Sequence, residues 1–488
     1  MVLAVAFGLG GSVNQNMGSL KRLWEARDEF LVRNIRFSKW NVVFLFAACV
    51  IMGHMRIGAF DGYMPAFGPF AFQAMGYGVG VLVFAFLPHS HILDVGRFGA
   101  VLALASLVAK AAAPQAAGAV LSLICSFAVG LCIGGALYVF FFMLNNTERF
   151  LNMIVIELYY VVCVYGSLCR EASPRISEML AYVFAVFFAV AMFAVKKGEV
   201  TEKALPKKGH CGADDGCCRV GRSGNGAVFY LYVVFMAVYS LSTFIVWKES
   251  YVVYTAYTVG AFAAIAFAVI AQMLIVKSTW YTWKIFLIGT LASTAILAID
   301  GIFDPRLGSL LYGLANSLGH IAIFYLVGSA ANITGCLKFF RTFCIIEFLL
   351  SFALNPAVEY LFLGNEENNS LIALGLMAGI ACVTLAVYPV LHRQIFESEW
   401  IKDINILNPE KFAHSHEGDV ANTHADGLGL TPREKQIFAM MLTEMSVKQI
   451  MLELEISRGT FNFHTANLYR KLGIQSRTEL FAKHGSKE

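Results

Sequence analysis

Four ionisable residues lie inside long apolar stretches of the sequence. Glu157 occurs in MIVIELYYVV, Glu347 in TFCIIEFLLSF, His320 near the middle of a third stretch, and Arg56 in a fourth. Because such groups are costly in apolar surroundings, those that are present tend to be paired or to bind a ligand. We therefore treat Arg56, Glu157, His320 and Glu347 as candidate ligand-binding residues. The alternative is a structural hydrogen bond or ion pair between helices, which Arg56 and a carboxylate would provide.

A different set of polar residues gathers near the end of the chain, in SRGTFNFHTANLYRKLG at residues 457–473. At helical spacing, Phe461, Leu468 and Leu472 share one face with His464 or Thr465, and this face is expected to pack on a core. Guanidinium groups bind phosphates, Asn pairs with adenine, and Phe or Ala touches the methyl group of thymine, so the opposite face has the chemistry for binding DNA. That face consists of Arg458, Asn462, Phe463, Ala466, Asn467 and Arg470.

The other polar clusters predict neither catalysis nor a metal site. The segment HCGADDGCCR contains His210, Cys211, Cys217 and Cys218, which could bind a metal or sense oxidation. Their spacing matches no standard zinc module, so a solvated linker is the simpler interpretation. His464 has no acid–base partner near it in the sequence pattern, and no nucleophile motif or phosphate loop stands out. We therefore predict that the protein is not an enzyme and has no catalytic residue, metal or cofactor.

The elements that must position these residues follow from the composition. Apolar residues make up 58% of the 488 residues and charged residues 14%, whereas globular chains are about 45–50% apolar and about 25% charged. The apolar residues gather into runs long enough to cross a bilayer as helices, in two groups of six. These runs lie near 41–60, 65–87, 93–113, 116–144, 150–169 and 177–195, and near 227–247, 252–276, 284–303, 308–331, 340–363 and 370–391.

The positions of Lys and Arg predict the orientation of these spans. Basic residues are abundant before the first span, between the two groups, and in alternate gaps on the same side. The positive-inside rule therefore puts both termini in the cytoplasm, and an even number of spans agrees with this. The opposite gaps hold only Lys110, Arg170, Arg175, Lys248 and Arg306.

Two groups of six spans around a long basic loop resemble the major facilitator transporters, in which two six-helix halves enclose a central cavity. The resemblance covers residues 41–391 and rests on the layout of the spans. The family's loop between spans two and three reads D-R-x-G-R, whereas LDVGRFG places Asp94, Gly96 and Arg97 one position out of step. This difference argues against active transport.

The residues from Leu430 onward carry the start signals of four short helices. In TPRE, Thr431 is the expected N-cap and Glu434 its partner, and later helices begin at SVKQ, at Ser457 and at SRTE. These helices resemble the LuxR-type helix-turn-helix domain, which is also found at the end of response regulators of the NarL and FixJ type. The matching residues are Leu430, Thr431, Arg433, Glu434, Ile437, Phe438, Ser446, Ile450, Leu454, Ser457, Thr460, His464, Asn467, Leu468, Lys471, Leu472, Gly473, Ser476 and Arg477.

The resemblance implies that the third helix enters the major groove of double-stranded DNA. It also implies a homodimer on DNA, because relatives pair through the fourth helix, here about 477–485. The family's Lys in T-V-K is Asn462 here, which favours an A·T-rich operator, and Met445 and Met451 replace a Gly and an Ala. The residues expected to contact DNA are Lys448, Arg458, Thr460, Asn462, Phe463, Ala466, Asn467, Arg470, Lys471 and Arg477.

The predicted fold is all-α: a polytopic, major-facilitator-like bundle of twelve helices, followed by a small four-helix domain without a wing. The predicted parts are 1–40, a cytoplasmic segment with an amphipathic helix; 41–195, six spans; 196–226, a cytoplasmic central loop; 227–391, six more spans; 392–429, a linker; and 430–485, the helix-turn-helix domain.

These features predict a one-component transcription regulator in a bacterial inner membrane. The bundle is expected to sense a small-molecule effector and to control DNA binding by the cytoplasmic domain, with the lipid bilayer and a promoter as partners. The alternative is a major-facilitator-type transporter with a regulatory DNA-binding tail, which substrate uptake into vesicles would reveal.

Overall fold

The computed structural model describes residues 35–57, 69–112, 118–172, 174–196, 217–248, 253–274, 278–298, 303–354, 357–358, 369–396 and most of 430–484. Within these ranges every regular element is a helix. Contacts divide the chain into two compact units, Met1–Ile406 and Leu407–Glu488. Most of the segment 1–40 and of the linker 392–429 lies outside the described residues, and with it the predicted amphipathic helix.

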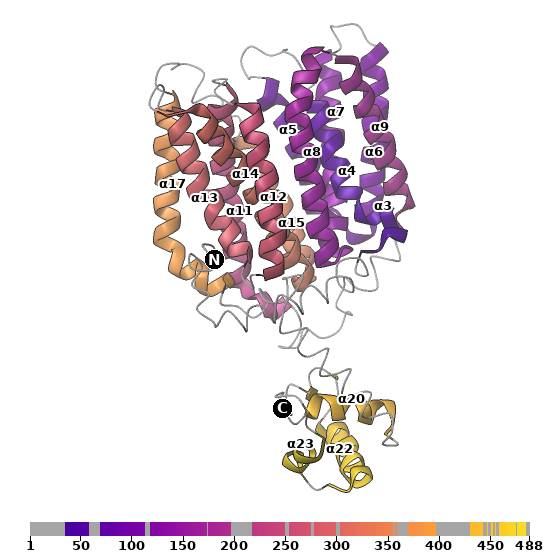
Figure 1. Cartoon of the computed structure of the whole chain (residues 1–488). Helices are drawn as coiled ribbons and strands as arrows, with labels where there is room; N and C mark the ends of the chain where they lie inside the picture. The colour runs from indigo at the N-terminus through magenta and orange to yellow at the C-terminus, as the bar shows by residue number, and fades with distance from the viewer. Residues whose placement is uncertain are drawn as a thin grey trace. The chain divides into compact units, whose positions relative to one another are not determined.

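The first unit is a bundle of long helices in two groups, which lie side by side in Figure 1. This arrangement confirms the predicted all-α, polytopic bundle. The first group consists of α3 (Trp40–Val43), α4 (Leu45–Ile57), α5 (Pro69–Phe86), α6 (Ile92–Ala112), α7 (Gly118–Phe142), α8 (Asn146–Ala172) and α9 (Pro174–Ala194). The second consists of α11 (Cys217–Lys248), α12 (Tyr254–Leu274), α13 (Ser278–Ala298), α14 (Pro305–Thr334), α15 (Leu337–Leu349) with the π-helix η4 (Leu350–Leu354), and α17 (Asn369–Leu391) with the π-helix η5 (His392–Phe396).

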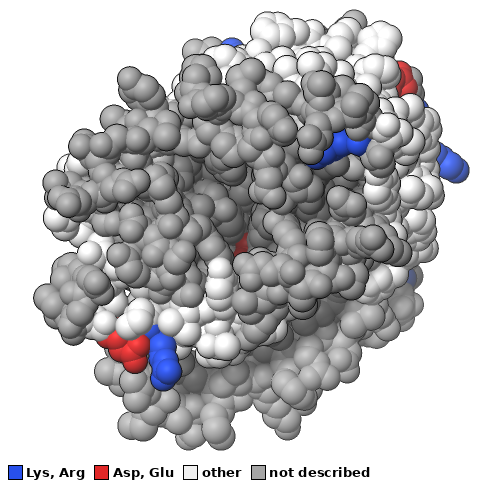
Figure 2. Space-filling view, turned by 90° about the horizontal axis from the view of Figure 1, so that it is seen from above, with Lys and Arg blue, Asp and Glu red and all other residues white. Residues whose placement is uncertain are grey.

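The helices of the bundle have the length and composition of membrane spans. Among the described residues, six helices are long and apolar enough to cross a bilayer, and three further apolar helices are shorter. Large apolar side chains such as Val108, Phe262 and Leu385 point outward and are exposed, as expected of a surface that faces lipid. On the face that Figure 2 shows, the described charged side chains are few and scattered.

Glycines bring α5 and α7, the second and fourth helices of the first group after the four-residue α3, into close contact. A methyl group built on Gly80 of α5 would lie 2.4 Å from the carbonyl oxygen of Phe127, and one on Gly130 of α7 would lie 2.2 Å from that of Tyr77. Both distances are far below a van der Waals contact, so only glycine fits at these positions. Small residues of this kind allow membrane helices to pack backbone against backbone.

The second group repeats the same contact between its own second and fourth helices. A methyl group on Gly260 of α12 would lie 2.0 Å from the carbonyl oxygen of Leu310, and one on Gly313 of α14 would lie 2.1 Å from that of Tyr257. The two groups therefore share a packing motif at equivalent helices, which is the pattern of an internal repeat.

Buried polar contacts join the turn between α7 and α8 to the start of the bundle. The fully buried guanidinium of Arg149 donates from Nε to the carbonyl oxygen of Phe140 at 2.9 Å and from Nη1 to Asn146 at 2.7 Å, which satisfies groups at the ends of the two helices. Arg36 donates from Nε to the carboxylate of Glu148 at 2.7 Å. Arg36 and Arg149 thus lie at one end of the bundle.

Helix α11 extends beyond the apolar span that the sequence predicts for it. Helix α11 begins at Cys217, although the sequence placed a polar loop over 196–226 and the next span from 227. Residues 217–226 contain three glycines and few apolar residues, so the hydropathy pattern that defines a span does not reach them. The helix therefore starts before its apolar part does.

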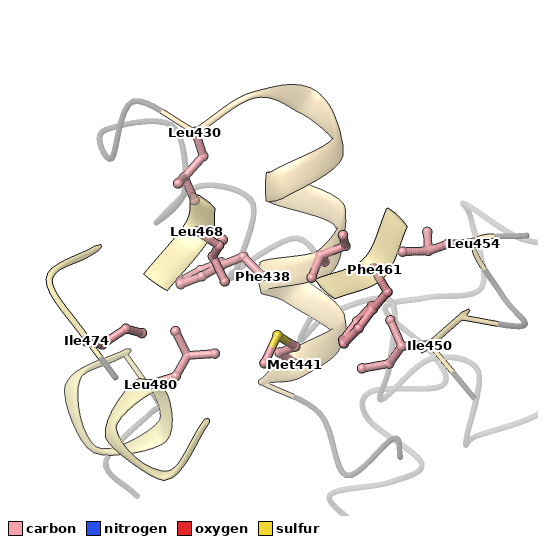
Figure 3. Packing of buried hydrophobic residues seen from close by; sticks show 10 residues of the cluster. Leu430, Phe438, Met441, Ile450, Leu454, Phe461, Leu468, Ile474 and Leu480 are labelled. Carbon is pink, nitrogen blue, oxygen red and sulfur yellow. The ribbon is translucent and has the colours of Figure 1, made fainter. Parts of the chain in front are cut away.

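The second unit is a small helical domain with its own core (Figure 3). Its helices include α20 (Pro432–Met441), α22 (Arg458–Leu472) and α23 (Arg477–His484), with further helical residues at 447 and 450–451. The predicted cap of α20 is present, because the Thr431 backbone N–H donates to Glu434 Oε2 at 2.8 Å. The core consists of Leu430, Ile437, Phe438, Met441, Ile450, Leu454, Phe461, Leu468, Ile474 and Leu480.

Candidate functional site

A cavity of about 230 Å³ lies between the two groups of helices in the first unit. Its walls come from α4, α5, α7 and α8 of the first group and from α11, α14 and α15 of the second. A ligand held here would therefore contact both groups at once. The described lining residues are Phe46, Val50, Gly53, Tyr77, Val129, Ile133, Leu137, Met153, Ile156, Tyr160, Tyr232, Phe235, Met236, Tyr239, His320, Phe324, Phe343 and Glu347.

Glu347 is the carboxylate in the wall of this cavity. Its Oε1 accepts a hydrogen bond from the hydroxyl of Tyr77 at 3.0 Å, and its Oε2 accepts one from the hydroxyl of Tyr232. The side chain is buried, so these hydroxyls supply the hydrogen bonds that water would otherwise provide. Since Tyr77 belongs to the first group and Tyr232 to the second, Glu347 joins the two groups.

His320 lies in the same cavity and faces a second carboxylate. Its Nδ1 is 3.2 Å from Oε1 of Glu157, a residue that is 1% exposed and lies behind the wall. The ring of Tyr160 stacks on the imidazole with a centroid separation of 5.6 Å, and Tyr239 packs against it at 4.9 Å. The imidazole is thus held between aromatic rings and turned toward Glu157.

The structure brings together three of the four ionisable residues that the sequence singled out. Glu347 and His320 line the cavity, and Glu157 contacts it through His320. Arg56 belongs to α4, but its side chain lies outside the described residues. Their role in binding a ligand stays a prediction.

Sequence reasoning missed the tyrosines of the cavity, because a tyrosine inside an apolar run carries no charge to mark it. One signal was present: Tyr232, Phe235, Met236 and Tyr239 follow the spacing i, i+3, i+4 and i+7, which places them on one face of α11. An aromatic face with two hydroxyls inside a span is a sign of a cavity wall.

The geometry of α22 agrees with the two faces expected from its sequence. Phe461 and Leu468 are buried in the core of the domain, whereas Arg458, Thr460, Asn462, Phe463, Ala466 and Arg470 are exposed. Phe463 is 64% exposed, so its ring is accessible on this face. Arg470 donates to the side-chain oxygen of Asn467 at 2.8 Å, which orients both groups on this face.

Two cations that were expected to contact DNA also have partners inside the domain. Lys471 Nζ donates to Oε2 of Glu434 at 2.6 Å, and Arg477 Nε donates to the carbonyl oxygen of Met441 at 2.9 Å. Burial raises the pKa of the Glu434 carboxyl, but the hydrogen bonds from Lys471 and Thr431 outweigh it and hold that pKa below its usual value. These contacts tie the helices of the domain together, a role that the sequence did not reveal. Lys448 lies outside the described residues.

The described residues contain no group of three or more His, Cys, Asp or Glu side chains that could hold a metal ion. From the sequence, His210, Cys211, Cys217 and Cys218 were considered as a possible metal site. These residues lie outside the described side chains. Among the described side chains, Cys49, Cys132 and Cys344 lie in the interior of the bundle and form no disulfide bond.

Comparison with known proteins concerns mainly the second unit. Residues 428–483 match the GerE model, which describes bacterial regulatory proteins of the luxR family. A protein of Aeromonas salmonicida, described as an HTH-type transcriptional regulator in the exeN 3' region, is 28% identical over 121 residues, which are 25% of this chain and 62% of that protein. The HTH-type transcriptional regulator MalT of Yersinia pestis (strain Pestoides F) is 37% identical over 87 residues, which are 16% of this chain and 10% of MalT. The chain thus spans less than two thirds of the length of these relatives.

Two solved structures overlap the bundle. The human organic anion transporter MFSD10 (TETRAN) has a TM-score of 0.44 and 14% identity, and the match covers 72% of this chain and 98% of that one. The major facilitator superfamily transporter FucP, in its outward conformation, has a TM-score of 0.45 and 13% identity, with coverage of 74% and 99%. The chain therefore joins a domain that matches the model of the luxR family of bacterial regulatory proteins, at residues 428–483, to a bundle of helices of which six are long and apolar enough to cross a membrane among the described residues.

Proposed function

We propose that the protein is a membrane-embedded, one-component transcription regulator. A small molecule binds in the cavity between the two groups of helices, and its binding alters DNA binding by the luxR-type domain. The cavity is the observation that carries this proposal, because its walls come from both groups. A ligand that contacts both groups can favour one arrangement of them over another, which is what a sensor requires.

The output is binding to promoter DNA through the exposed face of α22. The family match supports this function for residues 428–483, and the exposed Asn462, Phe463 and Arg470 offer a base-reading and phosphate-binding surface. DNA binding requires the domain to lie in the cytoplasm, so we place the chain in a bacterial inner membrane with both termini inside. We also expect two copies to bind together on DNA, as the resemblance to the family implies.

The proposal is tested in living cells, first for control of transcription by the DNA-binding domain and then for the response of the cavity to a ligand. Strains that carry Asn462→Ala in the full chain, or a deletion of the gene, are expected to change the same set of transcripts. Lys435→Ala, a change of a described cation on α20 outside the expected DNA contacts, is the matched control and should leave those transcripts as in wild type. If the Asn462→Ala strain and the deletion strain share no affected genes, the chain is not a regulator of this kind.

The input is tested on the genes found in this way. Glu347→Gln and Glu157→Gln are expected to blunt the response of those genes to the inducer, because both carboxylates belong to the cavity or to its His320 contact. Normal induction in both variants would remove these residues from the ligand site. A cavity between two helix groups is also what a transporter needs, so the purified chain in vesicles should be tested for gradient-driven uptake of the inducer. Clear uptake would favour transport with a regulatory tail.

A further inference from the structure

The described wall of the cavity carries more negative than positive charge. Glu347 lines the cavity, and the described lining residues include neither Lys nor Arg. The imidazole of His320 is the one described lining group that is a cation in its protonated form, and its Nδ1 faces Glu157 at 3.2 Å. Even a protonated His320 is therefore matched by Glu157, which leaves Glu347 without a counter-charge among these residues.

The surroundings of Glu347 are arranged around a carboxylate. Tyr77 and Tyr232 each donate a hydroxyl hydrogen, one to each carboxylate oxygen, so both oxygens act as acceptors. Hydrogen bonds of this type stabilise the charged form, whereas burial in an apolar wall disfavours it unless a cation is near. A positively charged ligand group would supply the missing partner.

The rest of the wall is suited to the body of such a ligand. Eight of the described lining residues have a Phe or Tyr ring, among them Tyr77, Tyr160, Tyr232 and Phe235. The face of an aromatic ring attracts a cation, and rings combined with a carboxylate are a common way to recognise ammonium groups. The same rings, with Val50, Ile133 and Leu137, bury apolar surface.

We infer that the occupant of this cavity is a small organic monocation, a protonated amine or a quaternary ammonium on an aromatic or aliphatic body. Its ammonium group contacts the carboxylate of Glu347, and its body packs against the aromatic wall. This inference rests on the proposed function only in taking the occupant to be the effector, since the charge and shape of the cavity hold without it.

The test compares three molecules that share one body and differ in charge. The full chain in phosphatidylcholine nanodiscs is incubated with radiolabelled 2-phenylethylammonium, and unlabelled 2-phenylethylammonium, 2-phenylethanol or 3-phenylpropionate is added as competitor. The alcohol and the carboxylate are expected to need about tenfold or higher concentrations than the amine for equal displacement, because they lack the charge-assisted contact. Equal displacement by the alcohol, or no saturable binding of the amine, overturns the inference.

Variants locate the binding. Glu347→Gln keeps the shape of the side chain and is expected to weaken amine binding by about tenfold or more. Asp304→Asn is the matched control, since it also removes one negative charge but keeps an N-cap at the start of α14, and it should bind as wild type does. Wild-type affinity in Glu347→Gln overturns the inference. If Glu347→Gln fails to fold, Tyr77→Phe provides a second variant with the same expected direction, and the three-molecule comparison on the unaltered chain stands by itself.

The same nanodiscs separate this inference from the proposed function. Without amine, they are mixed with sheared genomic DNA, and the captured fragments are sequenced. If specific DNA fragments are captured but the amine binds no better than the alcohol or the carboxylate, only the inference of a cationic effector is refuted. If the amine binds better than the alcohol and the carboxylate but no specific DNA fragments are captured, the proposed regulatory function is refuted and the cation site is retained.

Discussion

The Nδ1 atom of His320 lies 3.2 Å from Oε1 of Glu157, so that α14 of the second helix group faces α8 of the first. Both side chains are buried, and neither atom has a hydrogen-bond partner within the described part of the chain. A buried charge opposite a single partner becomes costly when the partner is removed. A ligand beside His320 therefore acts on a contact that joins the two groups.

The first prediction concerns this pair. Glu157→Gln and His320→Gln should each destabilise the bundle, because each leaves the other polar group buried without its neighbour. The double variant should be more stable than the sum of the single effects allows, by about 1–3 kcal/mol. Denaturant unfolding of the chain in mixed micelles measures the four proteins of this cycle. Strictly additive effects would mean that the two residues do not interact.

The second prediction concerns the exposed face of α22. Asn462→Ala and Arg470→Ala should each weaken binding to the captured promoter fragments by about 1–3 kcal/mol, because they remove polar contacts without disturbing Phe461 or Leu468. Fluorescence anisotropy at several salt concentrations measures the effect, and Lys435→Ala serves as control. If Arg470 binds a phosphate, its variant also shows a weaker dependence on salt. Unchanged affinity for DNA in both variants would show that this face of α22 does not enter the major groove.

The third prediction concerns acid stability of the second unit. The folded pKa of Glu434 lies below its usual value of 4.5, because the hydrogen bonds from Lys471 and Thr431 outweigh the effect of burial. A carboxyl group of this kind stabilises the folded state above its unfolded pKa, and that contribution is lost as the pH falls through the folded pKa. Thermal unfolding of residues 407–488, followed by circular dichroism from about pH 7 to pH 3, should therefore show a smaller loss of stability in Glu434→Gln than in wild type. Identical pH profiles of wild type and Glu434→Gln would show that the loss of stability at low pH comes from other carboxylates.

The fourth prediction concerns the glycines between helices. Gly260→Ala and Gly313→Ala should destabilise the bundle by about 1–3 kcal/mol or prevent its assembly, because the new methyl group would lie 2.0 Å and 2.1 Å from a carbonyl oxygen of the facing helix. Gly375→Ala in α17 is the control, since nothing lies within 4 Å of its added methyl group. Helix propensity should make this control neutral or stabilising by up to about 1 kcal/mol. Thermal unfolding in detergent compares the three, and equal behaviour would contradict the close packing.

The parts of the structure that depend on neighbouring residues could be predicted from the sequence. The spans follow from runs of apolar residues, and the contact between Thr431 and Glu434 follows from a three-residue spacing. The burial of Phe461 and Leu468 follows from helical periodicity.

The parts that depend on distant residues could not be predicted in this way. Tyr77 is 270 residues from Glu347 and Tyr232 is 115 residues from it, so their meeting depends on how α5, α11 and α15 pack. The contact of Lys471 with Glu434 has the same origin, since both residues were read as members of a motif rather than as partners. The ionisable residues were recognisable because charge is rare in spans, whereas the tyrosines beside them were not.

The glycine contacts have a consequence for how a signal could leave the cavity. Where α5 touches α7, and α12 touches α14, backbone lies against backbone, and no side chain can turn aside to absorb a displacement. A molecule that displaces His320 of α14 would therefore be expected to carry α12 along with it. A displacement that turns such a pair of helices grows with distance from the cavity, so it is largest at the ends of the helices.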